Sequence, residues 1–454
     1  MLSRALLGGA CGTPADPAGT LAAPFPSTVL EPLAATPVTG WGDGADAVLP
    51  ALIGEALAAD RDIAIARTRL DQARALRDQS AAARQPTLNA GAGSTRRRTG
   101  TTTTSVHDLG LDAGWEIDLW GRLAAADRAT QADVAGSAAT LAATRLSVAG
   151  EVAIAWTQWR GLHLRRDLVA ASLAAQAQTL QLTRWRAQAG LVSALDVDQA
   201  LGSVEQTRAQ LPALDTAIAQ AEHALLVLLG ITPDAATRTA LRARLGTPTL
   251  PPALAGLAVP DAVPAGRLRR RPDVIATEAA ISAELARLDQ TRAARRPTFR
   301  LSGSLGWQAA ALSALGGSGA LLATLAAAVD APLFDAGAGA AQVAAQQAVL
   351  ARAQLDYQAA VQDAARDAED QLAALAGSRA QAQALDEAAA AARRALQDAE
   401  RRYAAGLIDF TTLLDTRRTL LALDSSRASA DTDARLARIR LLKALGGPLD
   451  SPTP

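Results

Sequence analysis

Hydrophobic and polar residues alternate strictly along residues 108–119 of the chain. One face carries Leu109, Leu111, Ala113, Trp115, Ile117 and Leu119, and the other carries Asp108, Gly110, Asp112, Gly114, Glu116 and Asp118. Residues 299–308 alternate in the same way. A two-residue period sustained over this length is typical of a β-strand and does not arise from a helix. With the flanking segments, it predicts strand pairs at 87–120 and 297–335.

The two faces of these strands suit lipid on one side and water on the other, and about 9–11 tilted residues cross a bilayer. The polar face is then expected to line an aqueous lumen, with Asp108, Asp112, Glu116 and Arg300 as charged members. Because open strand edges do not survive in lipid, several four-stranded chains must close one barrel together. Two, three or four copies would all do so, and the periodicity does not choose among them.

One segment allows a different interpretation. No charged residue occurs between Arg300 and Asp330, so residues 309–329 could instead form a membrane helix. The sequence Gly-Gly-Ser-Gly at 316–319 disfavours a helix, because glycine loses the most backbone freedom on becoming helical. The strand pair is therefore the prediction, and the helix is the alternative.

Each strand pair is followed by a long stretch with apolar residues at every third or fourth position. Residues 122–188 and 338–405 are rich in Ala, Leu, Arg, Gln and Glu and contain no proline, which predicts uninterrupted helices. Such a helix, at about 1.5 Å per residue, has a length on the order of 100 Å. No globular domain needs a helix that long, whereas a tube across a bacterial periplasm does.

Glycines mark the ends of both long helices. After Gly190 and Gly406 a second helix runs back in each half, which predicts antiparallel helical hairpins at 122–230 and 338–446. Pro212 lies within the first return helix, and we expect it to kink that helix.

The chain is predicted to be a duplication. Gly190 and Gly230 of the first half align with Gly406 and Gly446 of the second at a constant offset of 216 residues (406 − 190 and 446 − 230). Each half then holds a helix, a strand pair and a long helical hairpin in the same order. The predicted segments are a signal-like segment at 1–11, a Pro-rich segment at 12–44, a first repeat at 45–245, a Pro-rich linker at 246–266, a second repeat at 267–447 and a tail at 448–454.

Charge and composition narrow the class of protein. Lys+Arg 45 balances Asp+Glu 45, so the chain lacks the broad basic field expected of a nucleic-acid-binding protein. His107, His163 and His223 lie far apart without ligand spacing, so we expect no metal site. No nucleophile–base constellation or Gly-rich phosphate loop occurs, so we expect no cofactor and no enzymatic activity.

The N-terminus resembles a bacterial lipoprotein signal. Arg4, a short apolar run at 5–10 and small residues precede Cys11. The run is shorter than an export signal usually needs, and Leu7 lies four rather than three places before the Cys. We expect acylation of Cys11, with an incidental thiol as the alternative.

Five short segments together resemble the TolC-like outer-membrane efflux channels, in their lipoprotein branch. They are GWEIDLWGR at 114–122, RPDV at 271–274, APLFDAG at 331–337, RYAAGL at 402–407 and KALGG at 443–447. The resemblance implies a mixed α/β membrane protein. Three chains would form a twelve-stranded outer-membrane β-barrel, continued by a long α-helical periplasmic barrel. It also implies a passive exit duct for small molecules, anchored by lipid and working with a periplasmic adaptor and an inner-membrane RND-type pump.

In such a tube the two hairpin turns lie at the periplasmic tip, where the chains converge. By resemblance to the family's tip sequence, the expected gate residues are Asp409, Tyr403, Arg402, Asp196 and Asp415. Three copies of Asp409 would concentrate negative potential in the pore, while Tyr403 and Arg402 would tie one hairpin to its neighbour. The alternative for each acidic residue is a solvated turn or a helix cap.

Two other functions fit parts of the sequence. The same fold could serve as the outer-membrane duct of a type I protein secretion system, although the lipoprotein-like start favours small-molecule efflux. A periplasmic coiled-coil scaffold is the alternative from another class, and it would show heptads without alternating strands.

Overall fold

The computed structural model describes residues 38–42, 48–246 and 265–448. Cys11 and most of the two Pro-rich segments lie outside the described residues. Lipid attachment at Cys11 therefore stays a prediction.

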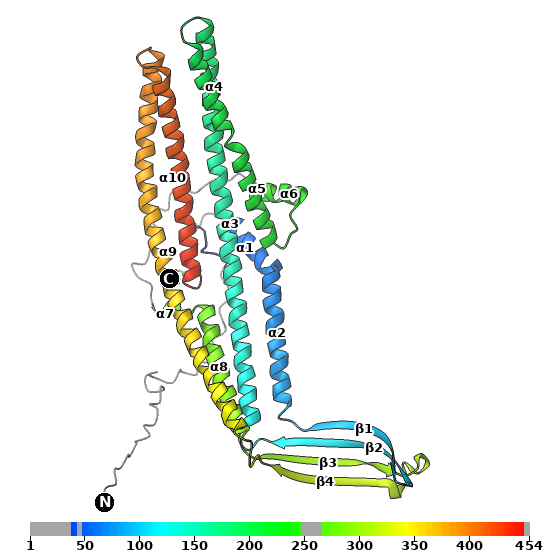
Figure 1. The fold of residues 1–454 in the computed structure, drawn as a ribbon. Coiled ribbons are helices and arrows are strands. Elements are labelled where there is room, and N and C mark those ends of the chain that lie inside the picture. Colours follow the sequence, from blue (N-terminus) through cyan, green and yellow to red (C-terminus); the bar gives the residue numbers. More distant parts are fainter. Residues whose placement is uncertain (1–37, 43–47, 247–264, 449–454) are drawn as a thin grey trace, which may run out of the picture. The chain divides into compact units, whose positions relative to one another are not determined.

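Four strands form one antiparallel sheet in the order β1-β2-β3-β4 (Figure 1). They are β1 (Thr87–Thr99), β2 (Thr102–Ile117), β3 (Thr298–Ala309) and β4 (Leu321–Asp330). Only single 3-10 turns, at Leu312–Ala314 and Ser318–Ala320, lie between β3 and β4, so the alternative of a membrane helix at 309–329 is wrong. The sheet also excludes a scaffold made of helices alone.

The strand register keeps the two faces of the sheet chemically distinct. On one face, Leu111 of β2 lies opposite Ala90 of β1 and Leu305 of β3. On the other face, Asp112 of β2 lies opposite Ser304 of β3. A slip of one residue would exchange the two faces, so the alternating sequence itself specifies this register.

The two long helices, α3 (Arg122–Gln188) and α9 (Ala338–Ala404), are each 67 residues long and match the predicted bounds to within one residue. α10 (Phe410–Ala444) returns along α9 as a single helix (Figure 1). A short helix, α7 (Ala265–Leu268), precedes α8 (Pro272–Ala293), which packs against both α3 and α9. The two halves of the sheet thus continue into helices that lie side by side.

The first return helix is broken where we predicted a kink. α4 (Ala194–Arg208) ends, and the chain resumes as α5 (Leu211–Leu228) with Pro212 in the first turn. At the start of a helix, proline lacks only an N–H that has no helical acceptor. Pro212 therefore begins a helix rather than bending one, and the prediction of one continuous return helix is wrong.

The segment before β1 holds two helices where we predicted one. α1 (Val48–Ala59) and α2 (Arg61–Ala82) meet at Asp60, whose carboxylate accepts hydrogen bonds from the backbone N–H groups of Asp62 at 2.9 Å and Ile63 at 3.1 Å. An aspartate in this position caps a new helix, which explains the division.

The sequence pattern also did not predict α6 (Ala235–Leu245), which is held in part by an ion pair to a buried carboxylate. Arg242 of α6 lies 2.6 Å from the fully buried carboxylate of Glu222 in α5, and Trp159 of α3 donates a hydrogen bond to the same carboxylate at 3.3 Å. Trp159 belongs to the largest apolar core, where α1, α3 and α5 meet. The ion pair fixes α6 to that core.

Each long helix starts at a glycine with positive φ, Gly121 at 74° and Gly337 at 89°. Residues with a Cβ rarely adopt this conformation. A preceding carboxylate satisfies the first N–H groups: Asp118 accepts from Ala124 at 2.8 Å, and Asp335 accepts from Gly337 at 2.9 Å. These hydrogen bonds satisfy backbone N–H groups at the point where the chain turns from strand to helix.

A substitution at Gly306 tests how closely β2 and β3 must approach each other. A Cβ at this position would lie 2.5 Å from the Leu109 carbonyl oxygen and 2.6 Å from the Gly110 Cα, so the two strands would have to separate. We expect Gly306→Ala to lower the free energy of unfolding by about 1–3 kcal/mol, measured by urea titration in detergent.

The matched control is Gly303→Ala in the same strand, where the new Cβ would come no closer than 3.5 Å to its nearest neighbour. This variant should stay within about 0.5 kcal/mol of the wild type. Equal effects of the two substitutions would show that the close approach at Gly306 is not required.

Candidate functional site

The polar face of the sheet brings the four predicted lumen residues together. Asp108, Asp112 and Glu116 follow one another at four-residue intervals on one face of β2, and Arg300 of β3 is the register partner of Glu116. Asp108 also lies over Gly93 of β1, because a Cβ there would come within 2.7 Å of its carboxylate. The face therefore carries a column of three carboxylates with one cation at its helix-side end.

Glu116 is not a free charge in this column. Its Oε1 accepts from the Arg122 guanidinium at 2.7 Å and 3.1 Å, and Arg122 is the first residue of α3. The pair joins the end of β2 to the first turn of α3. Among the residues that the structure describes, Asp108 and Asp112 make no such ion pair, so the unpaired negative charge lies nearer the middle of the strand.

The two hairpin turns at the other end of the long helices have the same hydrogen-bond geometry. Gly190 and Gly406 both have φ of 73°, and the residue after each donates back across the turn, Leu191 to Arg186 O at 2.8 Å and Leu407 to Arg402 O at 2.9 Å. This is the Schellman arrangement, which satisfies the last carbonyls of a helix. Both turns leave a leucine exposed at the tip.

Two of the predicted gate carboxylates cap helices at this tip. Asp409 caps α10, and its Oδ1 accepts from Thr412 N at 2.9 Å. Hydrogen bonds from Thr412 lower the pKa of Asp409, so it is ionised at neutral pH. Asp196 forms a reciprocal capping box with Ser193 at the start of α4.

Within the described ranges, the other two charged gate candidates make ion pairs only within their own helices. Asp415 is 75% exposed and lies 3.8 Å from Arg418. Arg402 pairs with Asp398 at 3.2 Å, one turn earlier in α9. Within this chain, therefore, Arg402 does not tie one hairpin to the other.

The ring of Tyr403, in contrast, does make a contact between the hairpins. The Arg186 guanidinium of α3 sits 5.0 Å from the ring centroid, and the Phe410 ring lies 5.9 Å away. The Tyr403 hydroxyl is buried without a hydrogen-bond partner in the described part of the chain. The contact is therefore a cation–π and packing contact rather than a hydrogen bond.

Arg417 makes a polar connection between the hairpins near the tip, and the sequence pattern did not indicate it. Its guanidinium in α10 donates to Ala175 O at 3.3 Å and to the Thr179 hydroxyl, both in α3, and to Glu400 of α9 at 2.7 Å. Beside it lies an apolar tip cluster of Leu180, Ala200, Val204, Phe410 and Leu414. No local sequence signal marks Arg417, because its partners lie far away in the chain.

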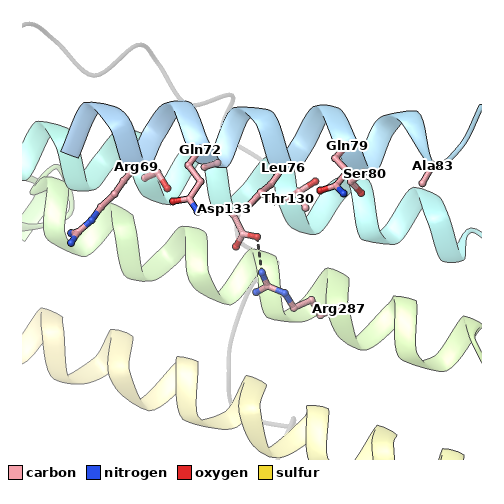
Figure 2. A pocket seen from close by; sticks show the side chains of 11 residues that line it. Arg69, Gln72, Leu76, Gln79, Ser80, Ala83, Thr130, Asp133 and Arg287 are labelled. Atoms are coloured by element: carbon pink, nitrogen blue, oxygen red, sulfur yellow. Dashed lines mark hydrogen bonds and ion pairs between the residues drawn. The ribbon is translucent and has the colours of Figure 1, made fainter. Parts of the chain in front are cut away.

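A groove of about 720 Å³ between α2, α3 and α8 is a further candidate for a binding or catalytic site (Figure 2). Its only carboxylate, Asp133, is paired with Arg287 at 2.6 Å. That leaves no free base to activate the neighbouring Ser and Thr hydroxyls. Within the described ranges, no three His, Cys, Asp or Glu side chains are grouped to hold a metal ion.

Comparison with known proteins agrees with this architecture. The family model described as outer membrane efflux protein matches residues 52–231 and 264–447. The toluene efflux pump outer membrane protein TtgF of Pseudomonas putida is 30% identical over 415 residues, covering 89% of this chain and 84% of TtgF. The pyoverdine export outer membrane protein OpmQ of Pseudomonas aeruginosa is 31% identical over 477 residues, covering 98% of this chain and 96% of OpmQ.

A solved structure is similar to the same extent. The outer-membrane channel OprN has 30% sequence identity and a TM-score of 0.82, over 88% of this chain and 90% of OprN. The family match covers all four strands and both long hairpins described above. The chain belongs to the outer membrane efflux protein family.

Proposed function

We propose that three copies of this chain close a passive exit duct for small molecules across the outer membrane. The observation that carries the proposal is the sheet: it has one continuous apolar face, one polar face and two unpaired edges, at β1 and β4. Pairing β4 of one chain with β1 of the next would satisfy every edge and close a twelve-stranded barrel. The duplicated helical hairpins would continue this barrel as a periplasmic tube.

In the proposed duct the polar face of the sheet lines the lumen. Asp108, Asp112, Glu116 and Arg300 would all face the water-filled interior. The energy for transport would come from an inner-membrane RND-type pump, connected through a periplasmic adaptor at the tip. Two relatives are named for toluene and pyoverdine rather than for a protein, which favours small-molecule cargo over protein secretion.

We place the gate at the hairpin tip. Within one chain, Arg417 and the Arg186–Tyr403 contact hold the two hairpins together and would keep the tip closed. Asp409 would contribute one exposed carboxylate per chain to a ring, because Ser193 occupies the equivalent cap in the first hairpin. Asp196, Asp415 and Arg402 would lie around this ring.

The assembly can be tested by mass. The chain has a mass of 46.5 kDa, and the complex extracted from the outer membrane in mild detergent should contain three copies. Native mass spectrometry gives the count directly. A stable monomer with all four strands intact would contradict barrel closure, because the edges of β1 and β4 would then need no partner.

Arg417→Ala should open the tip. The substitution removes charge-assisted hydrogen bonds worth about 1.5 kcal/mol or more, enough to shift a closed–open equilibrium about tenfold. Planar-bilayer recordings without an adaptor should therefore show higher mean conductance.

Arg418→Ala is the matched control for this experiment. It removes the same charge from the next residue, whose pair with Asp415 is exposed and loose. Its conductance should equal that of the wild type. Identical recordings for both variants would show that Arg417 does not hold the tip closed.

Asp409→Asn separates charge from helix capping, because asparagine caps a helix as well as aspartate does. The variant should fold normally but lose cation preference, seen as a shift of the reversal potential in a salt gradient. Asp415→Asn serves as the comparison. A shift with Asp415→Asn alone would place the charge ring at Asp415.

A further inference from the structure

Three consecutive arginines, Arg96 to Arg98, lie at the end of β1 that points away from the helices. All three are exposed, and no carboxylate occurs between Ser94 and His107. Among the described residues none of the three makes an ion pair; Arg98 donates only to the Gly100 carbonyl, at 3.3 Å. The β1–β2 hairpin end therefore carries three positive charges that find no acidic partner in the described part of the chain.

The register divides these arginines between the two faces of the sheet. Arg96 and Arg98 share a face with Leu88, Ala90 and Ala92, because they are separated from them by even numbers of residues. Arg97 lies on the opposite face, in the same row as Thr104. Two arginines thus extend from the apolar face and one from the polar face.

The height of the apolar face places Arg96 and Arg98 at its outer border. On β2 the apolar side chains of this face run from Ile117 to Leu109, a separation of eight residues (117 − 109). At about 3.3 Å per residue and a tilt of about 40°, this spans about 20 Å, close to the height of about 25 Å of the apolar band in outer-membrane barrels. Arg96, opposite Ser105, lies two same-face positions beyond Leu109.

A lipid that pairs with these arginines must present negative charge. A guanidinium group binds phosphate through two parallel hydrogen bonds, which a lysine ammonium cannot do. The β3–β4 connection, residues 309–320, carries no charge at all. The cationic site is therefore confined to the β1–β2 hairpin and occurs once per chain.

We propose that Arg96 and Arg98 bind the phosphate groups of a phosphorylated glycolipid in the outer leaflet, whereas Arg97 does not. The inference rests on the proposed function, since it takes the apolar face as the lipid-facing one. The opposite end of the sheet continues into the periplasmic helices, so the arginine end faces the outside. Bound lipid would neutralise the two charges and fix the height of the barrel in the membrane.

The test uses the full-length protein in lipid nanodiscs and native mass spectrometry. Diphosphorylated lipid A is titrated against wild type, Arg96→Ser, Arg98→Ser and Arg97→Ser, which all remove one charge from the same strand. We expect Arg96→Ser and Arg98→Ser each to weaken lipid binding about tenfold, and Arg97→Ser to change it less than about twofold. Dephosphorylated lipid A should bind all four proteins equally weakly.

Several results would overturn the proposal. Equal weakening by Arg97→Ser would show a diffuse positive field instead of a site on one face. Undiminished binding of diphosphorylated lipid A to the Arg96→Ser and Arg98→Ser variants would exclude phosphate recognition. Undiminished binding of dephosphorylated lipid A to the wild type would exclude it as well. Displacement by millimolar inorganic phosphate would show a free-anion site. If the wild type fails to enter nanodiscs as an oligomer, the proposed barrel itself is wrong, which is a distinguishable outcome.

Discussion

Hydrocarbon offers no hydrogen-bond partners to the outer edges of β1 and β4, and the architecture follows from this requirement. A four-stranded sheet with an apolar face is unstable alone in lipid, because each unpaired backbone group costs several kcal/mol. In the proposed oligomer, pairing with further copies would remove the edges and enclose the polar face with Asp108 and Asp112. The glycine turns at Gly121 and Gly337 would then carry each chain out of the closed sheet into helices long enough to continue the enclosure.

The parts of the fold that the sequence predicted well are those with strong local signals. The long helices were located to within one residue, because prolines and glycines bound them and nothing interrupts them. The central strands were located by alternation, and the register pairs apolar with apolar residues as that alternation requires. The tip turns were found from Gly190 and Gly406, whose positive φ only glycine adopts easily.

The parts that the sequence did not reveal depend on contacts between distant segments. The effect of Pro212 depends on whether a helix starts there, which packing decides. α6 is held by the pair between Arg242 and Glu222 and by Leu241 and Leu245, whose partners in the core come from distant parts of the chain. Arg417 is one arginine among many, and its role depends on Thr179 and Ala175, which lie more than 200 residues away in the chain. Local patterns carry no information about such pairs.

The break between α4 and α5 makes the two hairpins of a chain mechanically unequal. The second hairpin returns through one unbroken helix, whereas the first returns through two rods joined at Ala209 and Gln210. In a trimer, stiff and jointed hairpins would alternate around the tube. The helical tube would then have only threefold symmetry in its stiffness, and a twisting load applied at the tip would be absorbed at three joints rather than spread evenly around the wall.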